Sequence, residues 1–167
     1  MTSGHGEDAV RLAAIRRVAG EVPDPEIPVL TIADLGVLRD VAIEDGRAVV
    51  SITPTYTGCP AMNMIRDEIV AAVERAGLGP VEVRTVLSPA WTTDWMSAAG
   101  REALRTYGIA PPAPEPAPVT FFRTVPVACP RCGSTDTTEI AAFGSTACKS
   151  LRRCERCREP FDYFKTH

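Results

Sequence analysis

Residues 37–52 read VLRDVAIEDGRAVVSI and decide the fold of the first part of the chain. Valine and isoleucine are concentrated in two runs, from Val37 to Ile43 and from Ala48 to Ile52, on either side of Glu44-Asp45-Gly46. An Asp-Gly step between two such runs is a strong hairpin signal, because both residues accept the positive φ angles of a two-residue turn. The stretch therefore predicts an antiparallel pair of strands.

Three helical segments and one further strand surround this hairpin. Apolar residues from Asp8 to about Ala19 recur on one helical face, and Gly20 ends the pattern. A second helix is expected from Pro60 to about Ala76, a half-buried strand from Val81 to Leu87, and a third helix from Thr93 or Asp94 to about Tyr107. The order predicts an α+β fold, with a compact αββαβα domain built around a small mixed sheet.

A proline-rich run separates this domain from the tail. Five of the 15 prolines lie in residues 111–118, which read PPAPEPAP. Proline fixes φ and lacks an amide donor, so the run predicts an extended linker, or a strap packed along the first domain. We therefore expect a first domain over 1–110, a linker over 111–118 and a small β-rich domain over 119–167. The distribution of charge agrees with this division of the chain. Residues 1–118 contain 10 arginines and 16 acidic residues, whereas residues 119–167 contain 8 basic and 5 acidic residues.

The tail contains two Cys-x-x-Cys pairs, Cys129/Cys132 and Cys154/Cys157. Two residues between thiolates let a tight turn direct both sulfurs at one ion, and a second pair completes a tetrahedron. A segment of about 49 residues buries too little apolar surface to fold alone, so a metal is expected to hold its short strands together, near 125–128, 139–143 and 161–164. Zinc in a closed, structural site is the prediction. Iron in a rubredoxin-like site and disulfides are the alternatives.

Cys59 is the single cysteine of the first domain, in the run Thr53-Pro-Thr-Tyr-Thr-Gly-Cys59-Pro60. Proline at the first helical position puts Cys59 at the N-cap of the second helix. Unpaired amides and the positive helix end favour a thiolate, so the pKa of Cys59 is expected below its usual ~8.5. Such a thiolate suits metal ligation, cluster transfer or attack on an electrophile; a small packed cysteine is the alternative. Asp24 and Glu26 are either its partners in binding a metal or turn residues.

The motifs that the sequence lacks argue against several classes of protein. The chain contains no Walker A, Gly-x-Ser-x-Gly or His-Glu-x-x-His motif, and its two histidines are His5 and His167. These absences argue against a free-standing enzyme. No apolar run approaches the roughly 18–20 residues that span a bilayer, and the first residues lack the pattern of a secretory signal. A cytoplasmic protein is therefore expected. Cys148, beside Lys149, is either a reactive thiol or a packed residue.

Several segments of both parts resemble the PaaD family of phenylacetate degradation. They are Asp24-Pro-Glu26-Ile-Pro28, Asp34-Leu-Gly36-Val, residues 53–61, Trp91-Thr-Thr-Asp-Trp95, residues 108–112, residues 143–149 and residues 159–165. The first domain is similar to the SufT-like iron–sulfur assembly domain, whose members carry a reactive cysteine at the place of Cys59. Asp24 and Glu26 fit the acidic motif of that domain.

The resemblance implies a non-catalytic accessory subunit of phenylacetyl-CoA epoxidase, a multicomponent di-iron monooxygenase. Such a subunit would help to mature or assemble iron or iron–sulfur centres, with iron or a cluster passing transiently through Cys59. The implied partners are the di-iron oxygenase and iron–sulfur reductase components, and a homodimer stays open; neither a membrane nor nucleic acid is expected. The alternatives are an oxygenase component carrying an electron-transfer or structural metal, and a zinc-ribbon nucleic-acid binder, for which the tail offers Arg152, Arg153, Arg156 and Arg158.

Overall fold

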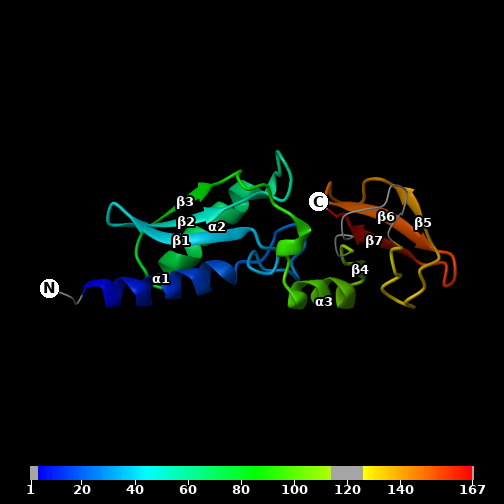
Figure 1. The fold of residues 1–167 in the computed structure, drawn as a ribbon, viewed down its shortest axis with the longest axis horizontal. Coiled ribbons are helices and arrows are strands. Elements are labelled where there is room, and N and C mark those ends of the chain that lie inside the picture. Colours follow the sequence, from blue (N-terminus) through cyan, green and yellow to red (C-terminus); the bar gives the residue numbers. More distant parts are fainter. Residues whose placement is uncertain (1–3, 114–125, 167) are drawn as a thin grey trace. The chain divides into compact units, whose positions relative to one another are not determined.

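The computed structural model describes residues 4–113 and 126–166, and its contacts divide the chain into two compact units between Trp91 and Thr92 (Figure 1). The first unit contains α1 (Gly4–Gly20), β1 (Leu38–Glu44), β2 (Arg47–Ile52), α2 (Ala61–Arg75) and β3 (Val81–Thr85). The second contains the short 3-10 helix η1 (Thr93–Trp95), α3 (Ala98–Tyr107), β4 (Ile109–Ala110), β5 (Thr137–Ala141), β6 (Lys149–Cys154) and β7 (Pro160–Phe164). The predicted α+β class is confirmed.

The predicted hairpin joins β1 to β2. Asp45 and Gly46 both have positive φ, 49° and 78°, as a two-residue turn with the twist of the flanking strands requires. The two strands pair antiparallel from Glu44 and Arg47 outward, with an irregularity in register between Leu38 and Asp40. The Asp-Gly step therefore sets the register of the sheet as expected.

The third strand makes the sheet mixed. β3 pairs parallel with β2, from Ala48 opposite Val81 to Ile52 opposite Thr85, and the strand order is β1-β2-β3. Parallel neighbours need a crossover, and α2 supplies it. Four of its apolar residues recur every four positions and are buried: Ala61, Ile65, Ile69 and Val73. Because the two strands are parallel, β2 and β3 end at the same edge of the sheet, where the segment carrying Cys59 begins.

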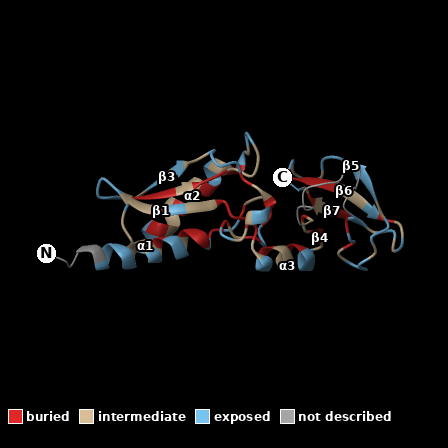
Figure 2. Cartoon of the chain, viewed as in Figure 1, coloured by how far each residue is buried: buried red, intermediate tan, exposed pale blue. Residues whose placement is uncertain are grey.

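The segment from residue 21 to 37 forms part of the core although it contains no helix or extended strand. Six of its apolar side chains are almost fully buried: Val22, Ile27, Leu30, Ile32, Leu35 and Val37. The buried positions follow this loop in red in Figure 2. Backbone bonds from Asp24 N to the Leu30 carbonyl (2.8 Å) and from Ile32 N to the Val22 carbonyl (2.9 Å) hold its shape. The three prolines of residues 22–28 are typical of a rigid loop, but no pattern in the sequence indicates that the segment is buried.

The helix bounds differ from expectation at two places. α1 begins at Gly4 instead of Asp8, with Glu7 in its first turn, where a negative charge favours the positive helix end. The predicted third helix is divided, because Met96 is extended and the Ser97 hydroxyl accepts the Gly100 amide (2.9 Å) and starts α3 afresh. Among the described residues, no helix has both the length and the apolar character needed to cross a bilayer.

The second unit is built on a sheet of order β4-β7-β6-β5. β4 pairs parallel with β7, so the chain before the proline run contributes a strand to the sheet of the tail. β5 and β7 overlap the predicted strands at 139–143 and 161–164, whereas residues 126–128 form no strand, Val125 lies outside the described residues and β6 was not predicted. The domain bounds 1–110, 111–118 and 119–167 stay a prediction, and residues 114–118 lie outside the described ranges.

The packing of α2 yields a first prediction. Ile69→Ala removes a side chain with no exposed surface. We expect it to lower the free energy of unfolding by about 2–5 kcal/mol, because the cavity cannot be refilled completely. Val10→Ala is the control, since Val10 is 72% exposed and its truncation should change stability by less than about 0.5 kcal/mol. Urea denaturation followed by circular dichroism measures both, and equal stabilities would contradict this packing.

Candidate functional site

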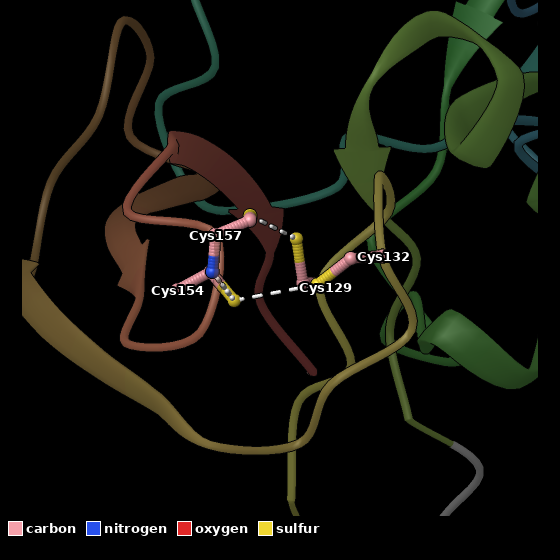
Figure 3. A group of neighbouring side chains, drawn as sticks. All are labelled: Cys129, Cys132, Cys154 and Cys157. Atoms are coloured by element: carbon pink, nitrogen blue, oxygen red, sulfur yellow. Dashed lines mark hydrogen bonds between the residues drawn. The ribbon is translucent and has the colours of Figure 1, made fainter.

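The four cysteines of the Cys-x-x-Cys pairs converge (Figure 3), and their Sγ atoms all lie within 4.8 Å of one another. The sulfurs of Cys132 and Cys154 are 3.5 Å apart, and those of Cys129 and Cys157 are 3.8 Å apart. Four thiolates about 2.3 Å from a tetrahedral Zn²⁺ are roughly 3.8 Å from each other. A disulfide bond is only about 2.05 Å long, and none of the six cysteines, all of them described, forms one. The cluster therefore has the dimensions of a four-thiolate metal site.

Two tight turns hold these sulfurs. The first is closed by hydrogen bonds from Gly133 N to the Cys129 carbonyl (2.9 Å) and from Cys129 N to the Ser134 carbonyl (2.9 Å). The second follows the end of β6, where Arg158 N donates to the Cys154 carbonyl (2.9 Å) and Cys157 N to the Cys154 sulfur (3.5 Å). Each pair therefore presents its sulfurs from a rigid knuckle, as the spacing predicts.

The sulfurs differ in how readily they ionise. The backbone N–H of Cys157 and other donors lower the pKa of Cys154 to about 7, against its burial. The Glu159 N–H favours the thiolate of Cys157, but burial and the neighbouring sulfurs raise its pKa to about 12. Thiols gathered this closely cannot all ionise without a cation among them. The donor set and its geometry fit a bound metal ion, which would hold all four as thiolates.

The Cys59 sulfur lies at the start of α2. The helix begins at Ala61, with Pro60 as its N-cap and Cys59 immediately before it. Gly58, with φ of +81°, forms the turn that precedes Cys59, and Cys59 N donates to the Tyr56 carbonyl (3.2 Å). The side chain is half-buried, and the Ala61 N–H donates to its sulfur. The predicted position at the helix start is thus shifted by one residue.

The predicted low pKa of Cys59 is wrong in sign. Burial raises the pKa of the thiol above its ordinary value, and the negative charges of Glu26 and Asp24 raise it further. The Ala61 N–H and the Tyr56 side chain act in the opposite direction but do not compensate. The effect of burial on the pKa of Cys59 therefore outweighs that of the helix N-terminus, and the thiol is neutral near pH 7. Sequence reasoning missed Tyr56, whose only signal was its place three residues before Cys59.

The structure brings Asp24 and Glu26 into electrostatic reach of Cys59. Asp24 is buried, and its Oδ1 accepts the backbone N–H groups of Glu26 (2.9 Å) and Ile27 (2.8 Å). Asp24 therefore closes the turn that carries Glu26. Their role as metal ligands stays a prediction.

Two further features of the tail are structural. Cys148 is buried outside the four-cysteine cluster, with its sulfur 3.0 Å from the Thr146 hydroxyl, which favours packing over reactivity. Three of the four arginines considered for nucleic acid have carboxylate partners: Arg152 pairs with Glu139, and Arg153 and Arg158 with Glu155. The tail surface is therefore mixed in charge and differs from the dense basic face of nucleic-acid binders.

Each of the two parts of the chain matches the model of a known protein family. Residues 12–87 match the model of the iron-sulfur cluster assembly protein family, and residues 113–165 match that of the PaaD zinc beta ribbon domain. The second match covers all four clustered cysteines, and the first covers Cys59, Asp24 and Glu26.

One relative aligns with most of this chain, and another aligns with about half of it. The chain is 53% identical over 147 residues to an Escherichia coli (strain K12) protein named as one component of a "Putative 1,2-phenylacetyl-CoA epoxidase", in an alignment that covers 87% of both chains. It is 38% identical to the Fe-S protein maturation auxiliary factor YitW of Bacillus subtilis (strain 168), over 50% of this chain and 83% of that one. A solved DUF59 domain from Bacillus anthracis superposes with a TM-score of 0.55 at 27% identity, over 60% of this chain and 97% of that one.

The raised pKa of Cys59 predicts slow alkylation. Iodoacetamide attacks the thiolate, so at pH 7 Cys59 should react more slowly than glutathione, and its rate should reach half its plateau at a higher pH than that of glutathione. Pulse labelling at increasing pH, followed by mass spectrometry of the peptide containing Cys59, measures the profile. A midpoint below that of glutathione would show that the helix end dominates after all.

Proposed function

The chain belongs to the PaaD family, and on this basis we propose that it is the accessory subunit of a phenylacetyl-CoA epoxidase and assists the maturation or assembly of the iron or iron–sulfur centres of that oxygenase. The support is twofold: a relative named as an epoxidase component aligns with most of the chain, and the first part matches an iron–sulfur assembly family. In this function the protein works in the cytoplasm without catalysing oxygenation. Its partners are the di-iron oxygenase and the iron–sulfur reductase components.

The observation that carries the proposal is the environment of Cys59. The Cys59 sulfur is half-buried at the start of α2 and accepts a hydrogen bond from the Ala61 N–H. The negative charges of Asp24 and Glu26 act on it electrostatically. One thiolate and two carboxylates form a mixed sulfur and oxygen ligand set that suits Fe²⁺. Because the thiol is protonated before it binds iron, binding releases a proton, and returning that proton helps to release the iron. Cys59 would therefore hold its cargo reversibly, as transfer to an apo-enzyme demands.

The four-cysteine site has a different role in this proposal. Cys129, Cys132, Cys154 and Cys157 would hold Zn²⁺, which supplies a cross-link between two turns. Four protein thiolates leave no open position on a tetrahedral ion, so the site is structural. The apolar cluster beside it is small and consists of Ala110, Val127 and Phe161 with partly buried Tyr163. The metal would therefore contribute much of the stability of the tail.

Replacing Cys59 tests the iron-handling role. When Cys59→Ser is co-expressed with the oxygenase components, the oxygenase activity recovered should fall to the level obtained without this chain, because a serine hydroxyl does not replace a thiolate as a soft ligand. Thr57→Ser is the control, since it shortens an exposed side chain in the same loop. Iron and sulfide analysis of anaerobically purified protein accompanies the assay. Full recovery with Cys59→Ser would remove Cys59 from the mechanism.

Replacing Cys132 tests the structural metal. Wild-type protein should be colourless with about one zinc per chain, and Cys132→Ser should lose the metal and the order of the tail, while the first unit still unfolds cooperatively. Cys59→Ser should retain its zinc. Metal analysis and two-dimensional NMR spectra distinguish these states. A tail that stays ordered after chelation would contradict the structural role, and red iron absorption would overturn the assignment of zinc.

A further inference from the structure

β3 is a rim strand of the first sheet, and among the described residues no strand pairs with its side away from β2 (Figure 1). Its five residues, Val81–Thr85, keep an unbroken register with β2. The other rim strands in the described ranges are irregular or short: β1 and β5 each contain an irregularity in register, and β4 has two residues. Bulges and short strands protect the rims of sheets against pairing with other chains. β3 is therefore the rim strand that lacks either protection.

The backbone groups of β3 alternate between its two sides. At the end of the pairing with β2, Val86 N donates to the Ile52 carbonyl (2.8 Å). Successive residues of a strand direct their N–H and C=O groups to opposite sides, so every second residue before Val86 also points to β2. The N–H and C=O groups of Val81, Val83 and Thr85 therefore point away from β2. These three residues can bond to a further strand.

Glu82 and Arg84 place opposite charges on the exposed face of β3. The Glu82 carboxylate and the Arg84 guanidinium are 2.9 Å apart, and the side chains are 49% and 45% exposed. If two copies of β3 pair antiparallel about Val83, Glu82 of each copy lies opposite Arg84 of the other. A pair centred on Glu82 or on Arg84 would instead oppose like charges, which is unfavourable. Charge therefore favours the register in which all five residues are paired.

We propose that the chain forms a homodimer in which β3 of two copies pairs antiparallel about Val83. In this register Val83 lies opposite Val83 of the partner subunit, and Val81 lies opposite Thr85 of the partner subunit. The residues whose backbone groups point outward thus exchange hydrogen bonds with each other. Glu82 and Arg84 fall in the closer, non-hydrogen-bonded pairs, where four charges of alternating sign form one network. The main-chain bonds supply the affinity, whereas the exposed charges fix the register.

This dimer determines where the two Cys59 loops lie. Thr85, at the carboxyl end of β3, is opposite Ile52, and the loop that carries Cys59 follows Ile52. Antiparallel pairing joins the carboxyl end of β3 in one subunit to the amino end of β3 in the other. The two Cys59 loops would therefore lie at opposite ends of the joined sheet, and neither subunit would contribute a ligand to the Cys59 of the other.

Charge reversal with rescue tests the pairing. In analytical ultracentrifugation the full wild-type chain should sediment as a dimer, and Glu82→Arg and Arg84→Glu should each raise the dissociation constant at least about tenfold, because like charges then lie opposite each other. A mixture of the two variants should restore a dimer with one chain of each, since every arginine then faces a glutamate. The double variant that carries both changes should dimerise as the wild type does.

Glu21→Arg is the matched control for these variants. Glu21 is 64% exposed and pairs with Arg17 at 3.2 Å, so the same change of charge is made in an exposed ion pair outside β3. It should leave the dissociation constant unchanged. The melting temperatures of all these variants should stay close to that of the wild type, because every altered side chain is exposed.

Hydrogen exchange tests the backbone contact separately. The Val83 N–H points away from β2, so its exchange should slow by at least about tenfold as the protein concentration rises and dimers form. A monomeric wild type, a dimer indifferent to the single reversals, single variants that fail to recombine, or a Val83 amide indifferent to concentration would each overturn the proposal. So would a Val83 amide that becomes protected only when the oxygenase components are added, since the rim would then bind a different protein.

Discussion

The parallel pairing of β2 with β3 is the constraint on which the first unit depends. Parallel neighbours cannot be joined by a tight turn, so the chain must cross over the sheet, and α2 is that crossover. The crossover puts the residues after β2, the start of α2 and the end of β3 at one edge. Cys59, Ala61 and Thr85 come from these three places. An open edge at the carboxyl ends of parallel strands is where α/β proteins usually bind their ligands, and here it holds the Cys59 thiol.

In the proposed function, the second unit depends instead on the metal that its four clustered cysteines would hold. It has a small apolar cluster, and two of the cysteines, Cys129 and Cys154, are among its most buried residues. In the proposed function, sulfur serves two purposes in one chain, and the surroundings of each sulfur decide between them. Four thiols within one coordination sphere would form a closed site, whereas a single thiol near two carboxylates would leave room for an exchangeable ion.

Local signals in the sequence were enough for part of this structure. Asp45-Gly46 specifies the hairpin because a two-residue turn depends only on its own φ angles, and the Cys-x-x-Cys spacing specifies the knuckles for the same reason. The sign of the pKa shift at Cys59 was missed because burial and the charges of Asp24 and Glu26 come from segments distant in sequence. The pairing of β4 with β7 and the burial of residues 21–37 were missed likewise, since both arise from contacts that no short pattern encodes.

The place of β4 has a consequence for any attempt to separate the tail from the rest. Ile109 and Ala110 cover part of the outer edge of β7, opposite Asp162 and Tyr163. A fragment that starts at the proline run would lack this cover and would present bare amide and carbonyl groups along a terminal strand. Such an edge recruits strands from other molecules, so the excised ribbon would self-associate even with its metal in place.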